Sequence, residues 1–418
     1  MAGLTKPYLR MKEKAAEIFS LPGGMRLVCR RAPLVLEYFG VAVNAGSRDE
    51  APDRFGLAHF VEHTIFKGTF RRRACHIINR MEAVGGDLNA FTSKEETNVY
   101  SVFPRGNLSR AIDLIADLIV NSRFPETELD KEREVVRDEI DSYLDTPAEA
   151  VYDDFEDMFY RGSQLGHNIL GTDKALDSFT PAVCRGYLTE NFTAPRMVAY
   201  YLGPEPPEKV LQRVQAGFAG VPVAGDALHR VRPVANPRFD ERRHIETHQS
   251  HTVVGASIPG LDAGNRETMA LITNILGGPG MNSRLNVSLR ERRGLVYTVE
   301  ASTTMFSDCG LFNVYFGCDP ADRDRCLELV FRELHRMASE PLTPRALAAA
   351  RKQYLGQLLV SSENLEQIIL STGRSLLLTG EVLSRREVEE ALTRISSEDV
   401  LEAAAMLEPE LCSVLSLG

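Results

Sequence analysis

Two histidines and a glutamate stand within five residues of one another near the start of the chain. His59, Glu62 and His63 form the pattern H-x-x-E-H inside an apolar-periodic run from Phe55 to Phe66. On a helix, residues four apart share a face, so the two imidazoles could bind one Zn²⁺ at about 2.0–2.1 Å. Glu62 could accept a proton from water activated by that metal. The pattern matches the reversed (inverzincin) form of a zinc hydrolase, but two surface histidines on an amphipathic helix would explain the five residues about as well.

A catalytic zinc site needs a third protein ligand. The strongly helical stretch 131–140 offers two carboxylates, Glu132 and Glu139, seven residues apart. Seven residues make two helical turns, so both side chains project from the same face. A solvated helix with charges paired at i,i+4 explains these residues equally well. The spacing alone leaves both interpretations open.

Residues 56–69 resemble the metal-binding helix of the superfamily that contains pitrilysin, insulin-degrading enzyme and the mitochondrial processing peptidase. The resemblance continues at residues 85–93, at 132–139 and at 289–297, and so spans nearly the whole chain in order. In that superfamily the third metal ligand follows the second histidine by 76 residues, which implies Glu139 in this chain. Glu132 matches a carboxylate that supports the metal site.

The resemblance also implies where a substrate would be held. Residues 85–93 match an edge strand beside the active site, to which a peptide would add as a further strand. The strand residues expected to contact the peptide are Leu88, Asn89, Ala90 and Phe91. Arg290 would hold a substrate carbonyl or carboxylate, and Tyr297 would donate a hydrogen bond to the oxyanion. Without the resemblance, a surface arginine and a packed strand tyrosine would be the simpler interpretations.

Composition excludes several classes of protein. The 418 residues are 44% hydrophobic and 25% charged, as is ordinary for a globular protein of two or three domains. No run approaches the roughly 20 apolar residues of a membrane span. A net charge of −10 without a basic, aromatic-rich stripe argues against a nucleic-acid partner. Seven scattered cysteines and a first segment without a secretory apolar core lead us to expect a cytoplasmic protein.

The chain is predicted to contain two halves of one plan. A strand at 99–103 precedes a helix at 107–121, just as a strand at 312–316 precedes a helix at 321–338. When the next helix of each half is aligned on its leucines, Glu139 falls on Gln357. The second half would then be a copy without metal carboxylates.

A glycine- and proline-rich stretch without helical periodicity separates the halves. We therefore expect a metal-binding half at 1–218, a linker at 219–238 and a second half at 239–418 that carries the arginine and the tyrosine. Alternating strands and long helices predict an α+β fold in which each half is an α/β layer. The resemblance implies a mixed sheet packed by helices in each half, and two halves that face each other like a clam shell.

These features predict a zinc-dependent metalloendopeptidase that cleaves peptides or unfolded segments inside a closed chamber. It would hold one Zn²⁺ per chain on His59, His63 and Glu139, with Glu62 as general base and Glu132 in support. Because one chain carries both the metal motif and the arginine–tyrosine pair, a homodimer is expected. Two alternatives stay open. One is the catalytic half of a heterodimer, and the other is a non-catalytic, peptide-holding scaffold of the same fold.

Overall fold

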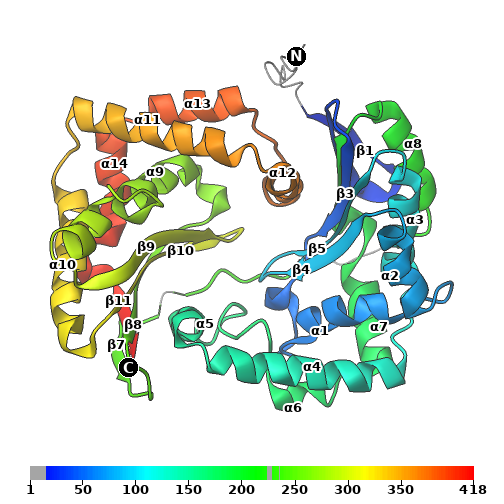
Figure 1. Cartoon of the computed structure of the whole chain (residues 1–418), viewed down its shortest axis with the longest axis horizontal. Coiled ribbons are helices and arrows are strands. Elements are labelled where there is room, and N and C mark those ends of the chain that lie inside the picture. Colours follow the sequence, from blue (N-terminus) through cyan, green and yellow to red (C-terminus); the bar gives the residue numbers. More distant parts are fainter. Residues whose placement is uncertain (1–15, 224–227, 235) are drawn as a thin grey trace, which may run out of the picture.

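The computed structural model describes residues 16–223, 228–234 and 236–418. Figure 1 shows two sheets on opposite sides of the molecule, each with its own group of helices on the outside. The first sheet and its helices come from the first half of the chain, in blue to green, and the second from the later part, in yellow-green to red.

The first half forms a six-stranded mixed sheet in the order β1-β2-β6-β3-β5-β4. β2 and β6 are parallel, and the other neighbours are antiparallel. The strands are β1 (Glu17–Ser20), β2 (Arg26–Arg31), β3 (Leu36–Val43), β4 (Asp87–Thr92), β5 (Thr97–Pro104) and β6 (Met197–Gly203). The helices are α1 (Leu57–Thr64), α2 (Ala74–Glu82), α3 (Leu108–Asn121), α4 (Glu126–Leu144), α5 (Pro147–Phe159), α6 (Asp173–Leu176), α7 (Pro181–Asn191) and α8 (Pro207–Gly217).

The second half forms a five-stranded mixed sheet in the order β7-β11-β8-β10-β9, in which β7 and β11 are parallel. Its strands are β7 (Asp240–Arg243), β8 (Ser250–Pro259), β9 (Val296–Met305), β10 (Cys309–Cys318) and β11 (Ser413–Leu417). Its helices are α9 (Arg266–Gly277), α10 (Arg323–Ser339), α11 (Pro344–Ser361), α12 (Leu365–Thr379), α13 (Arg385–Arg394) and α14 (Ser397–Ala404). A π-helical segment, η6 (Asn286–Glu291), lies between α9 and β9.

The two sheets repeat one topology, which confirms the predicted fold class. In sheet order, β2, β6, β3, β5 and β4 correspond to β7, β11, β8, β10 and β9, and β1 is an additional edge strand of the first sheet. The predicted helices at 107–121 and 321–338 appear as α3 and α10, each within two residues of the expected bounds. The helices that follow them, α4 and α11, are likewise at corresponding places.

One helix of each half packs on the sheet of the other half. Alternate residues of a strand point to opposite faces of its sheet, and the central strands β3, β6 and β8 are buried on both faces. One face of the first sheet packs on helices of its own half, and the other packs on α12 of the second half. Reciprocally, α5 of the first half covers the second sheet. Figure 1 shows both helices between the two sheets.

The contacts of the two exchanged helices are close. Gly373 of α12 lies so near Tyr200 of β6 that a Cβ there would come within 2.4 Å of the tyrosine ring. Phe155 of α5 lies against Gly255 of β8, where an added Cβ would meet the phenylalanine ring at 2.6 Å. The sequence therefore needs a glycine at each crossing, once on the helix and once on the strand.

A buried ionic cluster also joins the halves. The guanidinium of Arg48, in the first half, is 0% exposed and donates two hydrogen bonds, of 2.7 and 2.8 Å, to Asp308 in the β9–β10 turn. It also donates to Glu95 at 2.7 Å, and Glu95 in turn accepts from the backbone and hydroxyl of Ser307. Such bidentate charged bonds have a defined geometry. They fix the tip of the second sheet against the first half.

Candidate metal centre

The start of helix α1 is held by a buried carboxylate. Gly56 has a left-handed φ of +97°, which favours glycine. Glu50 accepts hydrogen bonds from the backbone N–H groups of Gly56 at 2.9 Å and of Ala58 at 2.5 Å. These are donors that the first turn of a helix leaves unpaired, and a negative charge there also suits the helix dipole. Glu50 thereby fixes where α1 begins, and with it the direction in which the histidines point.

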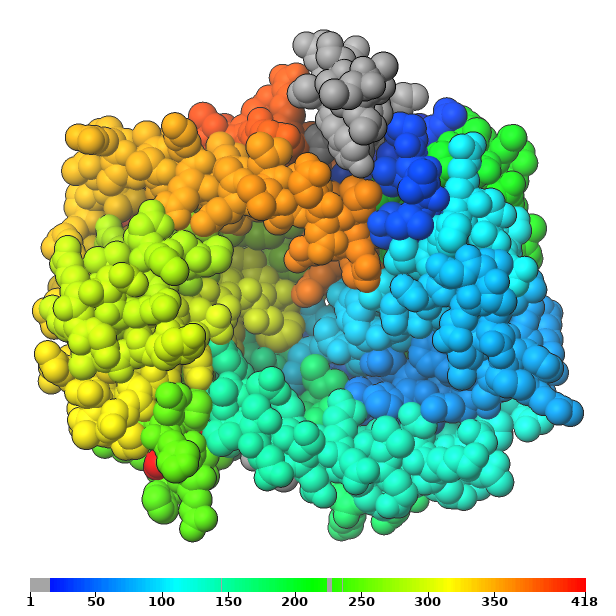
Figure 2. Space-filling model, in the orientation of Figure 1, coloured from blue at the N-terminus to red at the C-terminus, as the bar shows by residue number. Residues whose placement is uncertain are grey.

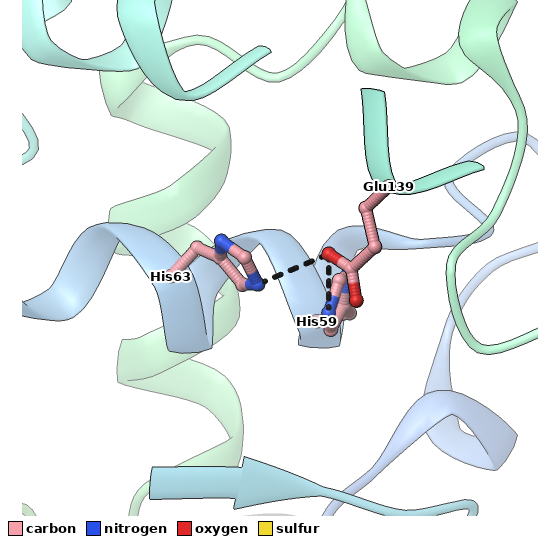
Figure 3. Close-up of side chains that lie close together, drawn as sticks. All are labelled: His59, His63 and Glu139. Carbon is pink, nitrogen blue, oxygen red and sulfur yellow. Dashed lines mark ion pairs between the residues drawn. The ribbon is translucent and has the colours of Figure 1, made fainter. Parts of the chain in front are cut away.

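His59 and His63 lie on α1 and meet Glu139 of α4, as Figure 3 shows. The Oε2 atom of Glu139 is 3.7 Å from Nε2 of His59 and 3.5 Å from Nε2 of His63. Two ligands at about 2.1 Å from a tetrahedral zinc ion are about 3.4 Å apart. The three ligand atoms all lie within 4.8 Å of one another. The separations of Glu139 from both histidines therefore fit a single zinc ion.

The protonation state of His59 also suits a metal. Burial, with a contribution from neighbouring His63, lowers the pKa of His59 to about 3. His59 is therefore neutral at physiological pH, and a neutral imidazole is the form that binds metal. Its Nδ1 is buried and has no hydrogen-bond partner among the described residues. The two rings meet edge to face with centroids 4.5 Å apart.

Glu132 lies behind His63. Its Oε1 is 3.2 Å from Nδ1 of His63, and its Oε2 is 2.6 Å from Nζ of Lys67. When Nδ1 donates to this carboxylate, the lone pair of the ring stays on Nε2, the atom that faces Glu139. The structure thus brings Glu132 to the centre from the same helix as Glu139, as the seven-residue spacing indicates.

Glu62 lies on α1 beside the histidines, next to β4. Burial raises the pKa of Glu62 above its ordinary value, and hydrogen bonding from Thr92 of β4 together with the charge of His63 offsets part of that effect. A carboxylate whose pKa is raised toward neutrality is better suited to exchange protons with a substrate at physiological pH. Thr92 ends the strand that we expect to bind the peptide, and its contact with Glu62 was not predicted from the sequence.

The strand expected to pair with a peptide lies at the edge of the first sheet. β4 is hydrogen-bonded only to β5, so its other side is unpaired among the described strands. Leu88, Ala90 and Phe91 are partly buried and Asn89 is exposed. An edge of this kind can accept an added strand through main-chain hydrogen bonds.

Arg290 and Tyr297 come together in the second half. The guanidinium of Arg290, in η6, lies 5.5 Å from the centre of the Tyr297 ring at the start of β9. Tyr297 is 79% exposed and is therefore not the packed core residue of the simpler interpretation. Both line a cavity of about 370 Å³, with Gly277, Pro279 and Glu300. The cluster of possible metal ligands among the described residues, His59, His63 and Glu139, includes neither of them.

Sequence reasoning missed two residues that act on this centre, Glu50 and Lys67. Glu50 acts through backbone N–H groups, which leave no trace in a side-chain motif. Lys67 pairs with Glu132 across 65 residues, and no local pattern reveals such a contact. Among the described residues, no helix has both the length and the apolar character needed to span a bilayer.

The chain matches two family models. Residues 36–173 match insulinase, peptidase family M16, and residues 178–354 match the peptidase M16 inactive domain. An uncharacterized zinc protease of Streptomyces coelicolor is 34% identical over 391 residues, which cover 90% of this chain and 83% of that protein. YmxG of Bacillus subtilis, also named an uncharacterized zinc protease, is 31% identical over 395 residues, covering 94% and 95% of the two chains.

Two solved structures show the same fold. A peptidase M16 inactive domain from Pseudomonas fluorescens superimposes with a TM-score of 0.90 at 17% identity, covering 96% of this chain and 97% of the other. A protease from Helicobacter pylori gives a TM-score of 0.87 at 18% identity, covering 97% of this chain and all of the other. Both alignments run through the two halves, so the relative placement of the sheets is shared as well.

Proposed function

The chain belongs to peptidase family M16, the insulinase family, and we propose that it is a zinc metalloendopeptidase that cleaves peptides or unfolded protein segments. One observation carries the proposal. The imidazoles of His59 and His63 on α1 and the carboxylate of Glu139 on α4, 76 residues beyond His63, place Glu139 at separations from both rings that suit one tetrahedral zinc ion. Glu62, the proposed general base, lies on α1 with both histidines.

His59, His63 and Glu139 would hold the ion, one per chain. Bound there, zinc supplies a Lewis acid for the attacking water and for the peptide carbonyl. Glu62 takes the proton from the water during attack and passes it to the leaving amine, which is general base catalysis followed by general acid catalysis. Glu132 accepts from Nδ1 of His63 and so keeps Nε2 available.

The substrate would add to the free edge of β4. Main-chain hydrogen bonds to Leu88, Asn89, Ala90 and Phe91 would align the peptide whatever its sequence. Tyr297 would donate a hydrogen bond to the oxyanion, and Arg290 would hold a peptide carbonyl or carboxylate. Both belong to the second half, so their roles require a substrate that reaches both halves.

Space between the halves supports the idea of a chamber. Figure 2 shows the surface hollowed between the first half and the second, below the helices at 344–379. A folded protein cannot offer an extended strand to β4 inside such a hollow. We further propose that the chain works as a homodimer, because it carries both the metal motif and the arginine–tyrosine pair. Sedimentation of the purified protein tests that part alone.

The test is digestion of matched substrates by purified, zinc-analysed protein. We expect internal cleavage of unstructured peptides by mass spectrometry, loss of cleavage with a chelator, recovery with added zinc, and no cleavage of the folded parent protein. A chain that binds unstructured peptides and holds zinc but cleaves none of them would instead be the non-catalytic scaffold. Efficient cleavage of a stably folded protein at a core strand would contradict the chamber.

A further inference from the structure

Lys67 lies just beyond the metal-binding helix and faces the supporting carboxylate. α1 ends at Thr64, and a 3₁₀ turn over Ile65–Lys67 follows, closed by Gly68 at a φ of +143°. The ammonium of Lys67 lies 2.6 Å from Oε2 of Glu132, close enough for a short charge-assisted hydrogen bond. The lysine side chain is 31% exposed, and that of Glu132 only 9%.

The geometry points to Lys67 as a positioning residue of the zinc centre, which acts through Glu132 on His63. This inference rests on the proposed function. Two contacts, one to each oxygen, hold a carboxylate at the end of a flexible side chain more firmly than one contact does. Lys67 engages Oε2, and this leaves Oε1 turned toward Nδ1 of His63 at 3.2 Å.

His63 and His59 receive unequal support, which localises the effect. Nδ1 of His63 faces a carboxylate that is itself anchored. Nδ1 of His59 has no hydrogen-bond partner among the described residues, although the ring is buried. Any change at Lys67 should therefore reach the metal through His63 and not through His59.

Charge compensation supports the same role. Within the described residues, the ion pairs of Glu132 are those with His63 and Lys67, so Lys67 is its only permanently charged partner. A carboxylate so nearly buried is costly without a paired cation. Lys67 lies in the turn after α1, and Glu132 lies on α4. Their ion pair therefore links the two helices that carry the ligands.

The experiment measures zinc affinity of the full-length chain by competition with a chromophoric chelator. Lys67→Met keeps the length of the side chain and removes its charge. We expect it to weaken zinc binding about tenfold, at the lower end of the 10–100-fold typical of supporting residues. Lys67→Arg should restore most of the affinity. Lys131→Met is the matched control, because Lys131 forms an exposed ion pair with Glu128 on the same helix as Glu132.

A double variant identifies the path. If Lys67 acts through Glu132, Lys67→Met should have little further effect once Glu132 is replaced. In a Glu132→Gln background, it should change zinc affinity by no more than about twofold, which is the usual error of such additivity tests. An equal loss in both backgrounds, unchanged affinity, or tighter binding in Lys67→Met would each overturn the inference. Failure of the proposed function looks different, because then the wild-type chain itself binds no zinc or binds it equally well after His59→Ala.

Discussion

Two pairs of helices occupy corresponding places in the two halves, and they carry different side chains. Where α1 meets α4, two imidazoles face a carboxylate. Where α9 meets α11, the amide of Asn274 donates a hydrogen bond to Gln357, the residue aligned with Glu139. Ala350 stands where the first half has Glu132. An amide pair satisfies its own donor and acceptor, whereas imidazole and carboxylate lone pairs converging on one point call for a cation. Both halves share the helix arrangement that brings these side chains together, and the identity of the side chains determines whether a metal could bind there.

The largest effect should come from Glu62, the proposed general base of the first half. Glu62→Gln keeps the size of the side chain and removes the base, so peptide turnover should fall by about 10²–10⁴-fold. Zinc content should stay at the wild-type value, because Glu62 is not among the ligand atoms that converge. Peptide hydrolysis and elemental analysis of one preparation check both. Glu134→Gln, at an exposed position of α4, serves as control, and activity within about threefold of wild type in Glu62→Gln would remove the general base from the mechanism.

Substitutions in α5 and α12 test whether the two halves depend on each other for stability. Phe155 of α5 is fully buried against the second sheet, so Phe155→Ala should cost about 3–5 kcal/mol of unfolding free energy. Leu376 of α12 packs on the first sheet, and Leu376→Ala should cost about 2–5 kcal/mol. Urea denaturation measures both, with the exposed Leu359→Ala as control.

Amide hydrogen exchange shows which elements each substitution destabilises. Phe155→Ala should reduce amide protection in β8 and β11, although the substitution lies in the first half. Protection lost only within the first half would mean that the exchange of helices does not couple the two units.

The second half is expected to contribute to turnover although it lacks the metal-binding set. Tyr297→Phe removes one oxyanion donor and should lower kcat by about 10²–10³-fold. Arg290→Ala should raise KM more than it lowers kcat, because it holds the peptide in the ground state and the transition state alike. Steady-state kinetics on an unstructured peptide separate the two, and exposed Arg292→Ala is the control. Wild-type kinetics in both variants would leave the second half a structural role only.

The smallest effect is one of stability in the metal-free protein. Burial raises the pKa of Glu62 in the folded state, so its ionised form opposes folding above that pKa. The folded state binds the extra proton as pH falls, and the penalty then disappears. Metal-free Glu62→Gln should therefore melt about 1–4 °C higher than wild type at pH 8, and the gain should shrink toward pH 5. A gain that stays constant with pH would show that Glu62 carries no such penalty.

Much of the frame follows from local patterns. Strand alternation and helix periodicity placed β5, α3, β10 and α10 close to their observed bounds, because each pattern reports on the element in which it occurs. The i,i+4 spacing put His59 and His63 on one face for the same reason. The repetition of these patterns in order predicted the duplication.

Contacts between distant segments lay beyond such reasoning. Glu139 reaches the histidines only through the packing of α4 on α1, so its role rested on the family spacing and not on geometry. The apolar faces of α5 and α12 show that something covers them, but not that the sheet of the other half does so. Lys67 meets Glu132 through tertiary packing, for which one sequence gives no signal, and Glu50 binds nearby backbone N–H groups, which leave no side-chain pattern.

The central claim is that the first half alone carries a zinc site, built on a frame that both halves share. Zinc content per chain, measured on wild type, Glu139→Gln and Gln357→Glu after dialysis against the same buffer, tests it most directly. We expect one zinc in wild type and in Gln357→Glu. In Glu139→Gln, zinc should be largely lost, since an amide replaces the charged ligand and the affinity should fall by more than the 10–100-fold typical of a supporting residue. Full zinc retention in Glu139→Gln, or a second zinc in the wild-type chain, would contradict the account.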